Sequence, residues 1–243
     1  MHTADTWREG QTVPAELIGC WQRAWIEYAD GMRDDTTIVI WLQLASEMAD
    51  VRVPVDRPSR GRRSFSECSL DELRSLTASE SSSGHTVCTP IEIGADGSRR
   101  ATAAWFTRGD GIGFHPVSAF PEPGLLQWQA TNVLIERAPS GAYVEEWHLI
   151  PDTRDPGLHH VDPLGRHVYR AGDVAIRIRD RAVPVTRQAR LDELVAECGD
   201  DREAVTALVD CEFSFARRRH DAFVIEASTL PWLEGEVIDV DLR

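Results

Sequence analysis

The chain has 243 residues, of which 42% are hydrophobic, and its formal net charge is −14. A chain of this length forms either one large β domain or two smaller domains. The negative charge disfavours a nucleic-acid partner, because phosphate binding needs a basic face. All 26 basic residues are Arg, and the absence of Lys excludes Schiff-base chemistry and covalent attachment of pyridoxal phosphate.

The sequence carries no sign of a membrane segment or a secretory signal. No stretch approaches the ~20 apolar residues that a transmembrane helix needs. The N-terminal residues lack the apolar core of a signal peptide. Five cysteines, with no Cys-x-x-Cys motif, favour reduced thiols over a disulfide framework. We therefore expect a cytoplasmic protein without a membrane partner.

The first part of the chain predicts six strands and one helix. Alternating or β-branched residues predict strands at residues 17–28, 34–44, 48–55, 87–94, 99–108 and 111–117. Ser69 and Glu72 have the spacing of a capping box, which predicts a helix that begins at Leu70. This order of elements is typical of a mainly β protein with short helices.

The second part of the chain repeats this order. Strands are predicted at residues 124–136, 142–150, 173–180, 210–218, 222–228 and 236–242, and helices at 190–198 and 203–209. The matched positions are residues 70–73 with 191–194, both Leu-Asp-Glu-Leu, Trp21 with Trp128, Trp41 with Trp147, and Cys88 with Cys211. We interpret residues 15–120 and 121–243 as two similar halves, with an inserted loop at 151–170 in the second.

Several short motifs resemble those of a known group of barrels. Gly19-x-Trp21 resembles the G-x-W signature of lipocalins and other calycin barrels, in which the Trp packs across the closed end of the barrel. The chain continues as G-x-W-x-R, then Tyr-x-Asp-Gly from Tyr28, Trp-Leu-Gln from Trp41, and Tyr-x-Glu-x-Trp-His from Tyr143. This fuller pattern resembles uncharacterised bacterial proteins and the fungal Hri family, which has two lipocalin-like halves. The resemblance covers most of residues 15–240 and implies a calycin-like (lipocalin-like) antiparallel barrel built from two similar halves, but no particular reaction.

Strand alternation indicates which side chains point into such a barrel. If Trp21 and Trp147 point inward, their neighbours two residues away along each strand do so too. The inward set with Trp41 then contains the candidate ligand-binding residues Trp21, Arg23, Trp25, Trp41 and Trp147, and the candidate catalytic residues Tyr143 and Glu145. Buried charges are costly unless paired. The inward Arg and Glu therefore form either a structural ion pair or the lining of a ligand cavity.

Two further groups of polar residues are candidates for chemistry. Glu146 and His148 share the opposite strand face, where they form either a general base with its carboxylate partner or an ordinary surface pair. The inserted loop holds His159 and His160, which we include among the ligand-binding candidates. This loop is either a lid that carries a His over the barrel mouth or a surface loop, and its spacing matches no metal-ligand pattern.

The sequence leads to one functional hypothesis and one alternative. We expect binding of a small, largely apolar metabolite in a β-barrel cavity, followed by acid/base chemistry of isomerase, cyclase or lyase type. No organic cofactor and no metal site are predicted. The alternative is a non-catalytic protein that binds a small molecule or haem. The partners expected are the small molecule and, at most, a second copy of the chain, since a monomer and a homodimer are both compatible with the sequence.

Overall fold

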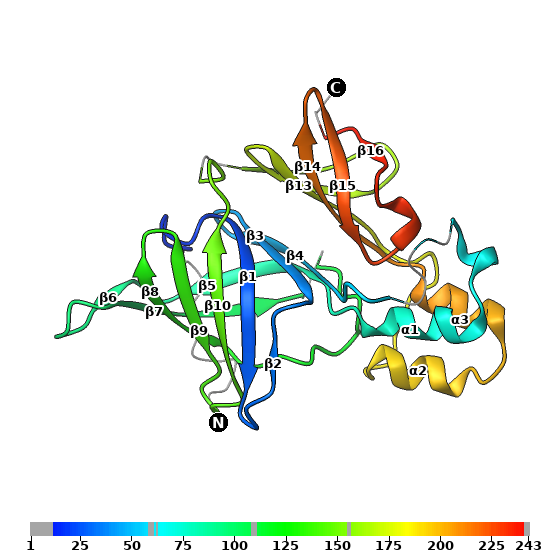
Figure 1. The fold of residues 1–243 in the computed structure, drawn as a ribbon, viewed down its shortest axis with the longest axis horizontal. Coiled ribbons are helices and arrows are strands. Elements are labelled where there is room, and N and C mark those ends of the chain that lie inside the picture. The colour runs from blue at the N-terminus through cyan, green and yellow to red at the C-terminus, as the bar shows by residue number, and fades with distance from the viewer. Residues whose placement is uncertain (1–11, 58–60, 62, 108–110, 155–156, 241–243) are drawn as a thin grey trace.

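The chain folds mainly into antiparallel β-sheet, as the computed structural model of residues 12–57, 61, 63–107, 111–154 and 157–240 shows (Figure 1). Eight strands form a closed barrel. In hydrogen-bonded order they are β10 (Tyr143–Leu149), β9 (Val133–Arg137), β8 (Gly124–Ala130), β7 (Arg99–Phe106), β5 (Ser82–Cys88), β4 (Glu47–Val53), β3 (Ile38–Gln43) and β1 (Gly19–Tyr28). Pairing of β10 with β1 closes the barrel, which confirms the predicted calycin-like antiparallel barrel.

Two short strands extend the barrel sheet. They are β2 (Arg33–Asp34), which pairs with β1, and β6 (Glu92–Ile93), which pairs with β7. The barrel contains strands from both sides of the predicted boundary at residue 120, because β8, β9 and β10 complete the sheet that β1 begins. That the two halves are copies of one unit stays a prediction.

A second, open sheet packs against the outside of the barrel (Figure 1). Its strands, in order, are β11 (Leu158–Val161), β12 (His167–Ala171), β13 (Val174–Arg179), β14 (Glu212–Arg219), β15 (Ala222–Ser228) and β16 (Val237–Ile238). Phe213 and Ile176 of this sheet share one hydrophobic cluster with Ile40 and Val51 of the barrel wall. The outer face of β3 and β4 is therefore buried, which explains why these strands are apolar on both faces.

Three short helices lie together beyond one end of the sheets (Figure 1). They are α1 (Leu70–Ser75), α2 (Leu191–Glu197) and α3 (Arg202–Val209). The predicted capping box is confirmed: Ser69 accepts a hydrogen bond from the Glu72 amide, and Glu72 accepts one from the Ser69 amide. Each Leu-Asp-Glu-Leu motif begins a helix, so α1 and α2 start at the same point of the repeated motif.

Several predicted elements are wrong. The single strand expected at residues 124–136 is two strands, β8 and β9, joined by a turn. Residues 111–117 were expected to form a strand, but they cross the barrel opening as a segment that makes only an isolated bridge, from Gly113 to Ser82. Residues 151–170 were expected to form a loop, but β11 and most of β12 lie within them as a hairpin. The polar, His-rich composition of β11 does not predict a strand. Its residues His159 and His160 are held in the sheet by pairing with Tyr169 and Val168 of β12, and no local apolar pattern marks them.

Trp21 and the segment before β1 fill one end of the barrel. The Trp21 side chain is fully buried, and its indole N–H donates to the carbonyl of Leu17 at 2.8 Å. The guanidinium of Arg154 lies 5.7 Å from the centre of the indole ring. Trp21 packs in the barrel interior with Val13 and Leu17. This end of the barrel is thus closed by apolar packing, which leaves the opposite end for a site.

Candidate functional site

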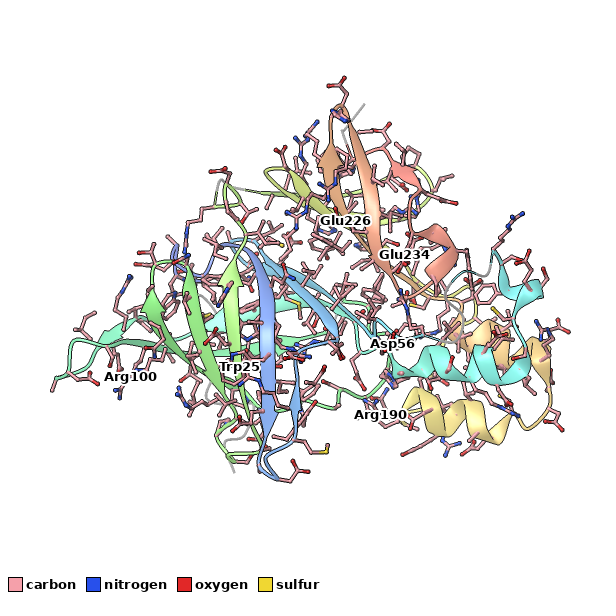
Figure 2. The ribbon with its side chains drawn as sticks, in the orientation of Figure 1. Trp25, Asp56, Arg100, Arg190, Glu226 and Glu234 are labelled. Atoms are coloured by element: carbon pink, nitrogen blue, oxygen red, sulfur yellow. The ribbon has the colours of Figure 1, made fainter. Side chains whose placement is uncertain are left out.

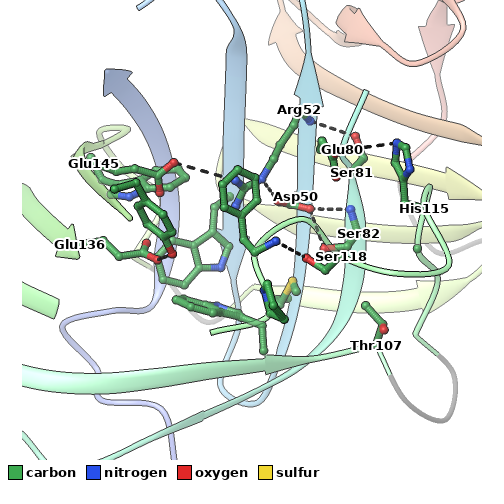
Figure 3. A pocket seen from close by; sticks show the side chains of 18 of the residues that line it. Asp50, Arg52, Glu80, Ser81, Ser82, Thr107, His115, Ser118, Glu136 and Glu145 are labelled. Carbon is green, nitrogen blue, oxygen red and sulfur yellow. Dashed lines mark hydrogen bonds and ion pairs between the residues drawn. The ribbon is translucent and has the colours of Figure 1, made fainter. Parts of the chain in front are cut away.

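A cavity of about 120 Å³ occupies the barrel interior between the tryptophans at its centre and the segment 113–121 that crosses its opening (Figure 3). Its lining is aromatic and acidic. The aromatic residues are Trp41, Trp105, Phe120, Tyr143 and Trp147, and the carboxyl groups are Asp50, Glu80, Glu136 and Glu145. The lining also contains Arg52 and His115. Small-molecule sites commonly have this form, an apolar concavity with a few converging polar groups.

Three indole rings form the inner wall of the cavity. Trp41 contacts Trp105 and Trp147 edge to face, with ring centres 5.5 Å and 5.7 Å away. Trp147 is only 1% exposed, and Trp21 and Trp41 are also buried. The inward direction predicted for Trp21, Trp41 and Trp147 is therefore confirmed. Their edge-to-face contacts fix the ring positions, because the positive edge of one ring meets the negative face of the next.

Arginines hold three of the cavity carboxylates, and the partner of Glu80 is Arg190. Glu145 accepts a hydrogen bond from Arg23 at 3.0 Å and lies 4.0 Å from Arg52. Asp50 is paired with Arg52 and also accepts from the Ser82 amide and hydroxyl (Figure 3). The two alternatives raised for the inward Arg and Glu thus coexist, since Glu145 is part of an ion-pair network and also lines the cavity.

Glu136 differs from the other carboxyl groups, because no ion pair reaches it in the described part of the chain. It lies on β9, is 4% exposed, and accepts one hydrogen bond, from the Tyr143 hydroxyl at 3.2 Å. Burial first, and then the charge of Glu145, raise the pKa of Glu136 to about 8, while Arg52 opposes this shift. Burial likewise raises the pKa of Tyr143. Glu136 is therefore mainly protonated at neutral pH, and Tyr143 is neutral.

Gly124 and the indole of Trp147 both border the Glu136 carboxyl. A methyl group added at Gly124 would lie 2.6 Å from the Glu136 carboxyl and 2.7 Å from Trp105, so glycine lets both side chains approach β8. The indole N–H of Trp147 is buried and makes no hydrogen bond of ordinary geometry to a described residue, but it lies close enough to the Glu136 carboxyl to lower its pKa. A buried donor without an acceptor is costly, and such groups are often found where a ligand binds.

His115 fastens the segment that covers the cavity. Its Nε2–H donates to the carbonyls of Thr77 and Ser79, and its Nδ1 accepts from the amide of Leu191 at the start of α2. Burial lowers the pKa of His115, Arg190 lowers it further, and Glu80 opposes this shift. The ring is therefore neutral, and both of its nitrogens connect the cover to the helical end of the molecule.

One residue of β1 that was predicted to point into the barrel, Trp25, points outward. A β-bulge between Arg23 and Trp25 changes the alternation along β1, so Arg23 points inward and Trp25 outward. Trp25, which Figure 2 labels, pairs in register with Glu146, and the guanidinium of Arg33 lies 4.3 Å from the centre of its ring. The predicted inward direction of Trp25 is wrong, because alternation of side chains fails across a bulge.

The predicted His residues also lie away from the cavity. His148 hydrogen-bonds Glu146 at 2.8 Å on the outer wall, and the His148 side chain is 53% exposed. His159 on β11 bonds Glu47 at 2.9 Å and His167 at 3.0 Å, and it stacks on Tyr169. It thus joins the open sheet to the barrel instead of covering the barrel opening. His160 is the next residue of the same strand, β11.

The sequence analysis missed Glu136, Asp50 and Arg52. Glu136 pairs in register with Glu145 across the β9–β10 hairpin, so the inward direction of Glu145 fixes that of Glu136. The signal was present in the hairpin spacing, but residues 124–136 had been assigned to one strand. Asp50 pairs in register with Trp41, so the inward tryptophan identifies Asp50 as a residue of the interior.

Comparison with known proteins does not assign a function to the site. No family model, curated protein or solved structure matches the chain. Within the described residues, none of the helices has the length and apolar composition needed to cross a membrane. In the same residues, no cluster of three or more His, Cys, Asp or Glu side chains is arranged to hold a metal ion.

Proposed function

We propose that this protein binds a small, largely apolar molecule in the barrel cavity and transforms it by proton transfer, without an organic cofactor. One observation carries the proposal: Glu136 is a buried carboxyl group in an aromatic cavity, with its pKa raised to about 8. A general acid or base is most effective when its pKa is close to the working pH. The resemblance of the G-x-W pattern to that of calycin barrels supports a binding role for the interior.

The neighbours of Glu136 suit a reaction that moves one proton. The Tyr143 hydroxyl holds one carboxyl oxygen of Glu136, which orients the proton on the other oxygen. The buried indole N–H of Trp147 lies next to the Glu136 carboxyl and is a second donor that a polar atom of the bound molecule can share. Two donors that converge on one oxygen stabilise the negative charge that develops there during an isomerisation, a cyclisation or an elimination.

The ion pairs and the cover complete this assignment. Arginines hold Glu145 and Asp50, so we assign these two residues the role of setting the field around Glu136. The segment anchored by His115 covers part of the opening, and so limits the access of water, which strengthens electrostatic interactions inside the cavity.

Binding without chemistry is the second candidate function. It is favoured by the fixed ion pairs, because Asp50 and Glu145 are held by arginines and bind a ligand without moving a proton. Haem binding finds less support. Among the described residues His115 is the histidine of the cavity lining, and both of its ring nitrogens are already bonded.

A comparison of two glutamate variants tests the proposal. Wild type, Glu136→Gln and Glu146→Gln would each be incubated with a metabolite extract, and bound and converted molecules would be followed by native and small-molecule mass spectrometry. Glu146 is the matched control, because it is a glutamate on the outer barrel wall. We expect wild type and Glu146→Gln to bind and convert the same compound, while Glu136→Gln binds it without conversion. Equal conversion by Glu136→Gln would contradict the catalytic role, and failure of wild type to bind any compound would contradict the site.

A further inference from the structure

The charges around the cavity do not balance. Asp34, Asp50 and Glu145 are joined in one network by Arg23 and Arg52. Three carboxylates meet two guanidinium groups, so this network carries one negative charge before Glu136 is counted. Glu136 adds a second negative charge when it ionises. In a cavity of low polarity, such an excess favours a positively charged partner.

The walls next to this charge are faces and edges of aromatic rings. Trp41, Trp105 and Trp147 surround the inner part of the cavity, and Phe120 and Tyr143 lie closer to its opening. The faces of such rings attract cations, and cages of this kind recognise methylated ammonium groups. The molecule already uses this interaction at the opening, where Arg52 lies 5.2 Å from the centre of the Phe120 ring.

We infer that the molecule bound in this cavity is a small organic cation, a protonated amine or a quaternary ammonium with an apolar body, whose positive charge lies between the Glu136 carboxylate and the indole rings. The inference rests on the proposed function, because it names the class of molecule that the same cavity binds. An anion is disfavoured, since the guanidinium of Arg52 is already held by Asp50 and faces Glu145.

The hydrogen-bond donors near Glu136 agree with this inference. An ionised Glu136 would accept stronger hydrogen bonds from Tyr143 and from Trp147, whose indole N–H already lies close enough to lower the pKa of Glu136 but makes no hydrogen bond of ordinary geometry. At neutral pH Glu136 is mainly protonated, so its carboxyl group is neutral until a cation displaces the proton. An organic cation takes the place of this proton: the O–H bond of Glu136 breaks, the proton passes to the buffer, and the carboxylate pairs with the cation.

Three probes of nearly the same shape test the inference. Choline is the cation, 3,3-dimethylbutan-1-ol is its neutral isostere, and 3,3-dimethylbutanoate is the anion. Binding would be measured by calorimetry and tryptophan fluorescence. We expect choline to bind at least about tenfold more tightly than the alcohol, and the anion to bind most weakly. Repeating the choline titration near pH 7 in buffers with different ionisation enthalpies should show release of close to one proton, and the alcohol should release none.

The pH dependence and two variants complete the test. Choline has no titrating group, so its affinity should rise as the pH is raised towards 9 and Glu136 ionises beside Tyr143, Glu145 and Arg52. Glu136→Gln should lose both this rise and the proton release, while Glu146→Gln keeps both. Equal or tighter binding of the alcohol or the anion would overturn the charge inference and leave the proposed cavity binding intact. If none of the three probes binds at millimolar concentration, the inference is overturned and the proposed function also loses support.

Discussion

At the scale of single residues, the cavity keeps a carboxyl group in an environment that disfavours its charge. Glu136 is protonated up to about pH 8 in the folded protein, whereas an unfolded chain releases this proton near the ordinary pKa of Glu, about 4.3. Between these two pH values the folded state binds more protons than the unfolded state. The contribution of this group to stability is therefore complete at low pH and is lost as the pH rises towards 8.

The variant Glu136→Gln should remove this dependence. The amide has nearly the shape of the carboxyl group but no proton to lose, so its stability relative to wild type should increase from pH 5 to pH 9. Urea unfolding at several pH values would measure the difference, which we expect to reach a few kcal/mol, on the order of magnitude that buried carboxyl groups show. Glu146→Gln should run parallel to wild type. If both variants run parallel to wild type, Glu136 does not hold the proton.

A second prediction concerns the central tryptophan of the cavity wall. Trp147→Ala removes a side chain that is 1% exposed and contacts Trp41, so we expect a loss of about 3–5 kcal/mol in the free energy of unfolding. Trp25→Ala is the matched control, because Trp25 is half-buried on the outer wall of the same barrel. Chemical denaturation of both variants checks the prediction. Equal losses in the free energy of unfolding would contradict the assignment of Trp147 to the buried interior and of Trp25 to the outer wall.

Most residue directions in the site could be predicted from sequence. Alternation from Trp21 and Trp147 correctly directed Arg23, Tyr143 and Glu145 inward, because a strand with one buried face has little freedom of register. The direction of Trp25 could not be predicted in this way, since no local sequence pattern indicates the β-bulge between Arg23 and Trp25. The role of Glu136 also depends on its distance from arginines on other strands, and strand patterns do not contain that information.

At the scale of elements, one glycine allows two barrel strands to approach each other. A methyl group added at Gly84 on β5 would lie 2.0 Å from the backbone carbonyl oxygen of Phe106 on β7. Backbone atoms cannot turn away as a side chain does. Gly84→Ala should therefore destabilise the barrel by about 1–3 kcal/mol, the range found for overpacked cores. Thermal unfolding would measure the loss.

Gly97→Ala provides the control for this prediction. Gly97 lies in the β6–β7 turn with a φ of 77°, and an added methyl group there meets nothing within 4 Å. Its cost comes from the backbone conformation alone, about 1 kcal/mol. A loss at Gly84 no larger than the loss at Gly97 would show that β5 and β7 separate easily.

The elements that the sequence analysis predicted wrongly depend on contacts with distant segments. The composition of residues 111–117 is typical of a strand. In the fold, however, His115 is held by hydrogen bonds to the backbone of Thr77, Ser79 and Leu191, none of which lies in a β-strand. The capping box at Ser69 was predictable, because all of its hydrogen bonds lie within four residues. Local patterns therefore predicted local structure, and the cover of the cavity needed the tertiary fold.

At the scale of the whole molecule, the five cysteines remain separate thiols. Cys20, Cys68, Cys88 and Cys211 are buried, and burial raises the pKa of Cys88 and of Cys211 to about 12. Thiol titration of denatured protein without reductant should find all five groups free. In native protein Cys198, which is half-buried, should react first, because buried thiols rarely form the reactive thiolate. A stable disulfide would contradict this assignment.

The barrel and the open sheet depend on each other through the β11–β12 hairpin. Val168, Tyr169 and Ala171 of β12 are buried, and His159 reaches across to Glu47 of the barrel. If residues 151–170 were an inserted lid, a short linker in their place would leave stability nearly unchanged. In the observed fold, replacing residues 157–171 by a Gly-Ser linker removes two strands of the sheet. The melting temperature should then fall by more than about 10 °C, because several buried side chains are lost together.

A milder change to the same hairpin separates the loss of these strands from the loss of its tip. Leu164 is 75% exposed in the turn between β11 and β12, so Leu164→Asn should leave the melting temperature within about 2 °C of wild type. His159→Ala should give an intermediate decrease, since it removes the bond to Glu47 and the stacking on Tyr169 while both strands remain. This order of effects requires the hairpin to connect the two sheets. If the linker variant had the same melting temperature as wild type, β11 and β12 would not be needed for the stability of the open sheet, and the structural role assigned to His159 would be wrong.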